Sequence, residues 1–201
     1  MPTLQGDIQC SRKLRFIVRA VPSRAEYINY LQKELPTAEW IIDHDYQGAM
    51  FTYLQALESL DNKSGILMED DALLCSGFIK KAEEEIARRS FDFINFFSMR
   101  KADLEIGSRW YSDYTCNVCT YIPEDHADKI LVWHKKYWIP ASYEGNKSTS
   151  ACDLFLRSYF KAHKIKCWIV VPNLIDHRIG KSAIDSRRSS KRISKTFERK
   201  T

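Results

Sequence analysis

The stretch Gly65-Ile66-Leu67-Met68-Glu69-Asp70-Asp71 decides the fold of this sequence. It begins as a short apolar run, which is typical of a buried strand, and ends in three consecutive carboxylates. Carboxylates this close repel one another and raise each other's pKa, so a metal ion or another cation is their natural partner. The alternative is an acidic loop at the start of the next helix, where the helix dipole stabilises negative charge.

Segments of two kinds alternate on both sides of this stretch. Hydrophobic periodicity predicts helices at residues 23–35, 48–60, 78–89 and 124–136 and from residue 153 onward, and strands at residues 14–18, 40–42, 65–68, 93–97, 118–122 and 165–171. Ser23 and Glu26 have the spacing of a capping box, and residues 98–116 are expected to be irregular. Strands that alternate with helices predict an α/β fold with a mostly parallel central sheet flanked by helices. In such sheets ligands bind beyond the carboxyl ends of the strands, where the three carboxylates lie.

The composition is that of an ordinary globular protein. A length of 201 residues suits one domain, and 44% hydrophobic residues are enough to build a sizeable core. No apolar run approaches the roughly 18 residues that a membrane span needs, and residues 1–13 lack the apolar region of a signal peptide. We therefore expect a cytoplasmic protein without a transmembrane segment.

The cysteines indicate a reducing environment. All six are scattered through the chain, and in the cytoplasm they are most simply free thiols that pack as small hydrophobes. Cys116 and Cys119 form one C-x-x-C pair, but the sequence has no second pair to complete a structural zinc site. We expect this pair to belong to a strand or loop.

The charge is unevenly distributed. Residues 178–201 contain nine Lys or Arg and two acidic residues, so their net charge is +7. The net charge of the whole chain is +5, which means that residues 1–177 carry −2. We therefore expect a near-neutral domain at residues 1–177 and a basic C-terminal tail at residues 178–201. Such a tail suits phosphate contacts with DNA through counterion release. The alternative is a solvated tail without a partner.

Short motifs at residues 48–57, 65–78, 119–131, 153–156 and 171–184 follow one another in a characteristic order. Together they resemble the core of GT-A glycosyltransferases, and most closely the lipopolysaccharide-type family, in which Glu-Asp-Asp follows an apolar strand. The resemblance covers most of the chain and implies a single GT-A (Rossmann-like) domain. It further implies transfer of a sugar from a nucleotide sugar, such as a UDP-sugar, to a hydroxyl acceptor. The implied cofactor is Mn²⁺ or Mg²⁺, which prefers hard oxygen ligands.

The resemblance assigns roles to the acidic motif and to one histidine. Asp71 would be the principal metal ligand, and Asp70 and Glu69 would support the metal and the ribose of the donor. His177 matches a C-terminal histidine that completes metal or diphosphate binding. Outside this resemblance, a lone histidine after a strand is more often a satisfied core or surface residue.

Asp153 matches the family's catalytic base, although Cys152 stands before it where an acidic residue is usual. A base of this kind takes the proton from the acceptor hydroxyl as its oxygen attacks the anomeric carbon. The alternative role of Asp153 is purely structural, because a carboxylate in the first turn of a helix is stabilised by the dipole.

Four further residues lie in the nucleotide-binding part that the resemblance implies. Arg19 and Arg24 follow the first strand, and a guanidinium group can bind a diphosphate with two hydrogen bonds, although either residue can also be a solvated surface charge. Asp43 ends the second predicted strand, where it would contact the base or ribose, or else cap the next helix. Gly48 opens that helix and belongs to the same motif.

The acceptor is the least determined part of the function. Arg109, Trp110 and Tyr111 combine charge with aromatic rings and could stack a sugar or a base, whereas Trp110 could equally pack into the core. The chain is similar in compactness to small phage glycosyltransferases that modify hydroxymethylated pyrimidines in DNA, which favours a DNA acceptor in the host cytoplasm. The alternatives are lipopolysaccharide or another glycan as acceptor, and a non-catalytic nucleic-acid-binding α/β domain without a metal requirement.

Overall fold

The computed structural model describes residues 14–99, 108–111, 116–137, 152–178 and 193–198. Within these ranges seven strands form one sheet, whose spatial order is β2 (Glu39–Ile42), β1 (Phe16–Ala20), β3 (Gly65–Glu69), β7 (Cys119–Ile122), β5 (Phe93–Asn95), β8 (Cys167–Ile169) and β6 (Arg109–Tyr111). The pairs β1–β2, β1–β3 and β5–β8 are parallel, whereas β7 is antiparallel to β3 and β5, and β6 is antiparallel to β8. Five strands therefore share one direction, which confirms the predicted α/β fold with a mostly parallel sheet.

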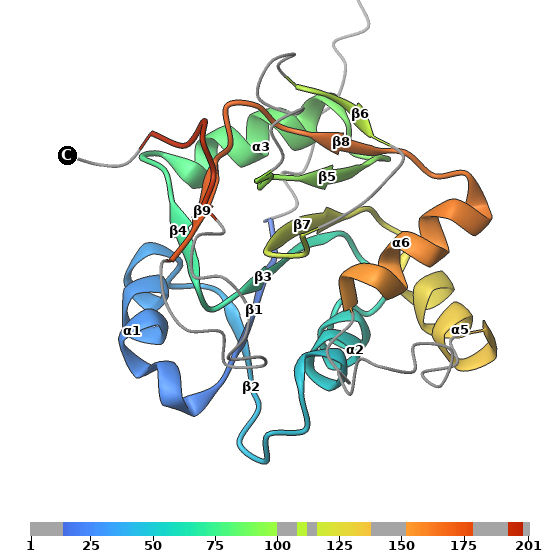
Figure 1. Cartoon of the computed structure of the whole chain (residues 1–201), viewed down its shortest axis with the longest axis horizontal. Helices are drawn as coiled ribbons and strands as arrows, with labels where there is room; N and C mark the ends of the chain where they lie inside the picture. The colour runs from blue at the N-terminus through green and yellow to red at the C-terminus, as the bar shows by residue number, and fades with distance from the viewer. Residues whose placement is uncertain (1–13, 100–107, 112–115, 138–151, 179–192, 199–201) are drawn as a thin grey trace, which may run out of the picture.

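Helices cover both faces of this sheet. They are α1 (Ala25–Glu34), α2 (Ala49–Ser59), α3 (Phe78–Arg88), α5 (Ala127–Tyr137) and α6 (Cys152–His163). In Figure 1, α2, α5 and α6 gather on one side of the molecule, and α1 and α3 lie away from them. The same division appears in the packing, because Leu31 of α1 and Phe78 and Ala82 of α3 belong to one apolar cluster, whereas the buried apolar residues of α2, α5 and α6 belong to another.

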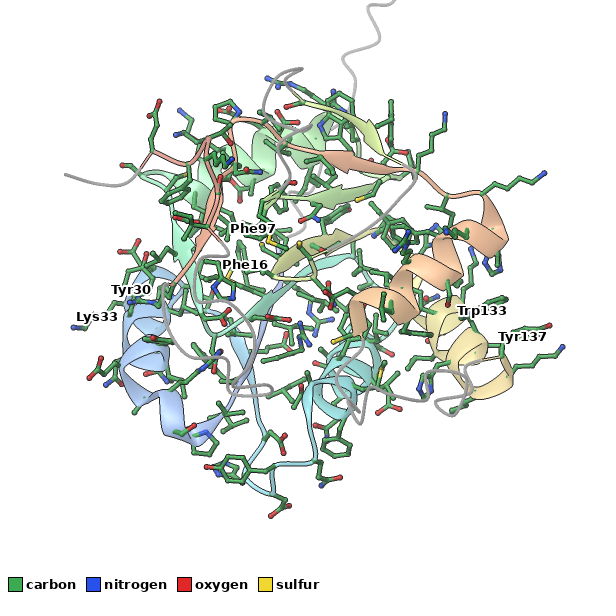
Figure 2. All side chains as sticks on the ribbon, in the orientation of Figure 1. Phe16, Tyr30, Lys33, Phe97, Trp133 and Tyr137 are labelled. Atoms are coloured by element: carbon green, nitrogen blue, oxygen red, sulfur yellow. The ribbon has the colours of Figure 1, made fainter. Side chains whose placement is uncertain are left out.

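The alternating side chains of β1 and β3 separate these two clusters. Phe16 and Val18 pack on the side of α1 and α3, whereas Ile17, between them, packs on the side of α2 and α6. Figure 2 shows Phe16 and Phe97 in the interior, where they are 4% and 1% exposed, and Tyr137 at the outer end of α5. A strand that is buried on both faces reads as a continuous apolar run, which is why β1 and β3 were recognisable in the sequence.

The first helix begins differently from the prediction. A 3₁₀ turn at Pro22–Arg24 precedes α1, and the helix starts at Ala25 without a side-chain hydrogen bond to its first turn. The capping box predicted from Ser23 and Glu26 is therefore wrong. Because Pro22 already starts a turn, Ser23 lies inside it and cannot act as the N-cap.

Three short strands were missing from the prediction. β4 (Ala72–Leu74) directly follows the acidic motif and pairs antiparallel with β9 (Ile175–His177), which places Ala72 opposite His177. This two-stranded ladder lies beside α1 and α3 in Figure 1. β6 occupies part of the segment that was expected to be irregular. The acidic motif consequently leads into a strand and does not cap a helix, because α3 starts only at Phe78, after β4.

The five described cysteines are buried, which agrees with the prediction that they pack as small hydrophobes. They are Cys75, Cys116, Cys119, Cys152 and Cys167. Burial in the apolar core raises the pKa of Cys152 to about 12, so this thiol stays protonated and unreactive at neutral pH. In the described ranges, no helix has the length and apolar character needed to cross a membrane.

Candidate functional site

The three carboxylates lie at the carboxyl end of β3, where the chain passes from the main sheet to the β4–β9 ladder. Asp70 and Asp71 are 3% and 4% exposed. The backbone N–H of Asp70 donates to the carbonyl of Arg19 at 3.0 Å, and the carbonyl of Asp71 accepts from the N–H of Arg178 at 2.9 Å. The main sheet and the ladder therefore both fix the backbone of this motif.

Arg24 joins the two aspartates. Its Nη1 donates to Oδ1 of Asp70 and, at 2.9 Å, to Oδ2 of Asp71. Oδ2 of Asp70 also accepts the backbone N–H of Val21 at 3.1 Å. Burial works to lower the pKa of Arg24, but attraction to Asp71 and Asp70 outweighs it and raises this pKa. The positive charge of Arg24 thus allows two adjacent carboxylates to be buried together.

His177 contacts the carboxylate of Asp71, which Arg24 also contacts. The register of the ladder places its Nε2 at 3.1 Å from Oδ2 of Asp71, and its Nδ1 at 2.7 Å from the carbonyl oxygen of Arg178. Because both ring nitrogens face acceptors, both must donate, which requires the charged imidazolium. Burial opposes this charge, but the hydrogen bond to Asp71 raises the pKa of His177. The pKa of Asp71 is lowered, because contacts with His177 and Arg24 outweigh its burial.

Glu69, the third carboxylate, pairs with Arg19. Nη2 of Arg19 donates to Oε1 of Glu69 at 3.0 Å and to the carbonyl of Asn117 at 3.3 Å. The guanidinium also lies 5.1 Å from the ring centre of Tyr53 and 3.9 Å from the sulfur of Cys152. Burial raises the pKa of Glu69 to about 7, against the opposing effect of Arg19. The Nη groups of Arg19 thus bond to β3, to the start of α2, to the loop before β7 and to α6, whereas its buried Nε has no hydrogen-bond partner among the described residues. Its predicted role toward a diphosphate stays a prediction.

Arg19→Met is expected to destabilise the fold by about 3–5 kcal/mol, because it leaves the partly buried Glu69 charge without its counter-charge. The matched control is Lys63→Ala, which removes an ion pair with Asp61 whose side chains are 63% and 81% exposed. This second change should cost no more than about 1 kcal/mol. Urea unfolding at pH 8 measures both free energies. Equal losses in the two variants would show that the Arg19–Glu69 pair contributes no more than a surface pair.

Asp43 and Gly48 shape the loop that leads into α2. The two carboxylate oxygens of Asp43 accept the backbone N–H groups of Gln47 and Gly48 at 2.8 and 2.7 Å. Gly48 has φ 105°, a conformation that residues with a Cβ rarely adopt. Asp43 therefore closes the loop before α2 but does not cap this helix, whose N-cap is Gly48 and which has no side-chain cap hydrogen bond. The role of Asp43 toward a base or ribose stays a prediction.

Asp153 lies in the first turn of α6, next to Cys152. The negative charge of Asp153 contributes to the raised pKa values of Glu69 and Tyr53, after the larger effect of burial on each. The fold thus brings a helix-start carboxylate to the acidic motif, although the two are far apart in the chain. The role of Asp153 as the catalytic base stays a prediction.

The predicted acceptor residues lie elsewhere. They are on β6, four strand positions from β3 in the sheet, and the side chains of Arg109 and Tyr111 lie outside the described part of the structure. Trp110 is 44% exposed, and its ring packs edge-on against that of Trp168, with 5.3 Å between the ring centres. Its role in stacking a sugar or a base stays a prediction. Trp110 lines a cavity of about 440 Å³ together with residues 91–93, 126 and 164–166, which lie at the amino ends of β5, α5 and β8. The fold therefore does not bring these residues together with the carboxylates.

Arg178 was counted only as part of the basic tail, yet it belongs to the site. Its guanidinium lies 4.6 Å from the ring centre of Tyr27 and 4.5 Å from that of Tyr30. Arg24 approaches the same Tyr27 ring at 5.7 Å. The spacing of the two tyrosines, three residues apart on α1, was the available signal, because such residues share a helix face. Two cationic groups thus gather over α1 beside Asp70 and Asp71.

The carboxylate oxygens of Asp71 are suitable ligands for a divalent cation. Oδ2 is engaged by Arg24 and His177, whereas Oδ1 is buried and has no hydrogen-bond partner in the described structure. Among the described residues, no three His, Cys, Asp or Glu side chains form a metal site by themselves. Mn²⁺ and Mg²⁺ commonly bind through one or two carboxylates and take their remaining ligands from substrate phosphates and water. To serve as a ligand, His177 would have to exchange its contact with Asp71.

Comparison with known proteins gives only distant similarities. No family model and no curated protein matches the sequence. Among solved structures, the chain is similar to A197 from STIV (15% identity, TM-score 0.48, 94% of this chain and 98% of that one). It is also similar to apo UDP-glucose pyrophosphorylase, with 11% identity and a TM-score of 0.45 over 78% of this chain and 72% of that one. A third similar structure is the inositol-1-phosphate CTP transferase from T. maritima, with 10% identity and a TM-score of 0.40 over 79% of this chain and 70% of that one.

Proposed function

We propose that this protein is a metal-dependent glycosyltransferase that uses a nucleotide sugar, with a UDP-sugar as the favoured donor. The observation that carries the proposal is Oδ1 of Asp71 at the carboxyl end of β3, which is buried and has no hydrogen-bond partner among the described residues. Leaving a carboxylate oxygen buried without a partner is costly, and a divalent cation held by Asp71 would remove that cost. The resemblance of the Glu69-Asp70-Asp71 motif to the lipopolysaccharide-type family supports sugar transfer as the reaction.

The proposed reaction assigns each group a defined task. The oxygen of the acceptor hydroxyl attacks the anomeric carbon, its proton passes to the carboxylate of Asp153, and the bond from that carbon to the diphosphate oxygen breaks. The cation held by Asp71 would neutralise charge on the leaving nucleoside diphosphate. Arg24, which is 17% exposed, is placed to add a hydrogen bond to the same diphosphate. Glu69 and Asp70 hold the cationic side chains Arg19 and Arg24 in place.

For the acceptor we favour a polymer, and specifically DNA with hydroxymethylated pyrimidines. Four strand spacings of about 4.8 Å separate β3 from β6, so a ligand that reaches from the acidic motif at the end of β3 to Trp110 on β6 must extend over about 19 Å. That length corresponds to about six base pairs of DNA. The net charge of +7 in residues 178–201 suits the same partner. A glycan chain of similar length is the alternative, and Trp110 could stack a sugar equally well.

A purely nucleic-acid-binding role is less consistent with the site. Oδ1 of Asp71 is buried and has no hydrogen-bond partner among the described residues, and the phosphate oxygens of a nucleic acid are acceptors that cannot supply one. With a bound cation the same carboxylate attracts a diphosphate.

A screen of nucleotide sugars tests the proposal. Thermal unfolding is followed with each nucleotide sugar, with and without Mn²⁺, since a ligand that binds only the folded state raises the melting temperature. We expect one donor to stabilise the protein only when Mn²⁺ is present. Release of the nucleotide is then measured with hydroxymethylated duplex DNA, with unmodified DNA and with a lipopolysaccharide acceptor. Stabilisation by no nucleotide sugar would overturn the proposed function, and turnover with the glycan alone would overturn the DNA acceptor.

A further inference from the structure

Part of the basic tail lies against the domain. Residues 193–198, which we name the C-terminal clasp, run beside β9 and are dark red in Figure 1. Ser194 is 7% exposed, and Phe197 packs against the apolar cluster that contains Phe16. A solvated tail would bury neither residue. The clasp is therefore part of the folded structure.

Asn173 holds the clasp through its side chain. Its Oδ1 accepts the hydroxyl groups of Ser194 at 2.8 Å and Thr196 at 2.9 Å, and its backbone N–H donates to the Thr196 hydroxyl at 3.0 Å. The Nδ2 of Asn173 donates to the carbonyl of Val170 at 3.0 Å, just after β8. The bonds of Asn173 to the Ser194 hydroxyl and to the Val170 carbonyl are buried, so they are protected from competition with water.

Asp176 connects the clasp to the carboxylate site. It is 1% exposed, and its Oδ1 accepts the backbone N–H of Ser194 at 2.7 Å and that of His177 at 2.8 Å. His177 in turn contacts Oδ2 of Asp71 at 3.1 Å. A continuous series of short contacts thus runs from Ser194 through Asp176 and His177 to Asp71.

The β4–β9 ladder needs such support. Each of its strands has three residues, and a two-stranded ladder is only marginally stable by itself. β4 pairs with one side of β9, and the clasp supplies the N–H of Ser194 to the Asp176 side chain within β9. Loss of this bond would leave a buried carboxylate with fewer donors and would favour separation of the ladder.

We infer that the clasp is a positioning element, in which Ser194 and Asp176 hold His177 against Asp71 and so preorganise the cation site. The inference rests on the proposed function for its catalytic consequence, but its structural consequence is independent of it. Residues that orient a metal ligand commonly change metal affinity by about 10- to 100-fold when removed. The clasp residues would act in this way, through His177 and not by contact with substrate.

Two variants in the full chain break the connection by different routes. Ser194→Pro removes the backbone donor, and Asp176→Ala removes the acceptor. Asp176→Asn keeps Oδ1 as an acceptor and is the rescue variant. Lys195→Ala, which changes an exposed side chain of the same segment, is the matched control.

Hydrogen exchange at the amide of Arg178, which bonds to the Asp71 carbonyl, reports directly on the ladder. We expect exchange at least about 10-fold faster in Ser194→Pro and Asp176→Ala, near-normal exchange in Asp176→Asn and Lys195→Ala, and unchanged protection in the centre of β3. The Mn²⁺ concentration that gives half-maximal turnover should rise about 10-fold or more in the first two variants.

The outcomes separate the two ideas. Normal exchange in both breaking variants would overturn the clasp. Faster exchange with an unchanged Mn²⁺ requirement would leave it a structural element only and overturn the positioning role. Faster exchange in a protein whose wild type turns over no nucleotide sugar would support the structural inference and refute the proposed function.

Discussion

Asp71→Asn should abolish sugar transfer, with a loss of at least about 10³-fold, because Lewis-acid stabilisation of the leaving diphosphate is worth several kcal/mol. The substitution keeps the shape of the side chain and removes its charge. The fold should survive, since Arg24 keeps its contact with Asp70 and His177 can lose its extra proton. Turnover of the nucleotide sugar and the melting temperature, measured on the same sample, check both statements.

The control for this variant is Asp61→Asn, which neutralises a carboxylate whose side chain is 81% exposed. It should leave turnover unchanged. Removal of the cation with EDTA should reproduce the Asp71→Asn result in the wild type, and added Mn²⁺ should restore the wild type but not the variant. Near-normal transfer by Asp71→Asn, or by the wild type in EDTA, would show that the reaction does not use a cation at this carboxylate.

For Asp153→Asn, we expect transfer to fall by about 10²- to 10⁴-fold, the usual contribution of a positioned general base. The KM for the donor should change little, because Asp153 is assigned to the acceptor hydroxyl and not to the nucleotide. Single-turnover rates at saturating donor give the comparison.

Asp128 offers a matched control for Asp153→Asn. Asp128 lies in the first turn of α5, just as Asp153 lies in the first turn of α6. Asp128→Asn therefore removes the same favourable interaction with a helix dipole without touching the site. If the two variants lose stability alike and neither loses activity, Asp153 is only a helix-start residue and the base must be sought elsewhere.

Some of the site was visible in the sequence, because its signals are local. Three carboxylates directly after an apolar strand can be read without knowing what surrounds them, and the carboxyl end of β3 is where they lie. Local patterns could not show what compensates their charge. Arg24 appeared as one of two arginines near the first strand, and only the turn at Pro22–Arg24 reveals that it bridges Asp70 and Asp71.

The placement of His177 shows the limit of such signals. A three-residue strand has too few positions for a periodic pattern, so β4 and β9 become recognisable only as partners of each other. Their pairing brings His177 to Asp71. The contact of Arg178 with the Tyr27 ring and the hydrogen bond from Ser194 to Asp176 likewise could not be read from local patterns. Each of these contacts joins segments that are distant in the chain.

The amino-acid sequence by itself determined the α/β class, the long helices, the buried strands β1 and β3 and the position of the carboxylates. Each of these follows from which face of a local segment is apolar, and burial of that face depends little on the identity of its partner. Only the tertiary structure decided the antiparallel direction of β7, the ladder that carries His177, the burial of Arg19 and the docking of residues 193–198. The physical reason is that these features depend on pairing polar groups from distant segments, and the free energy of each pair exists only once the fold has brought both partners out of water.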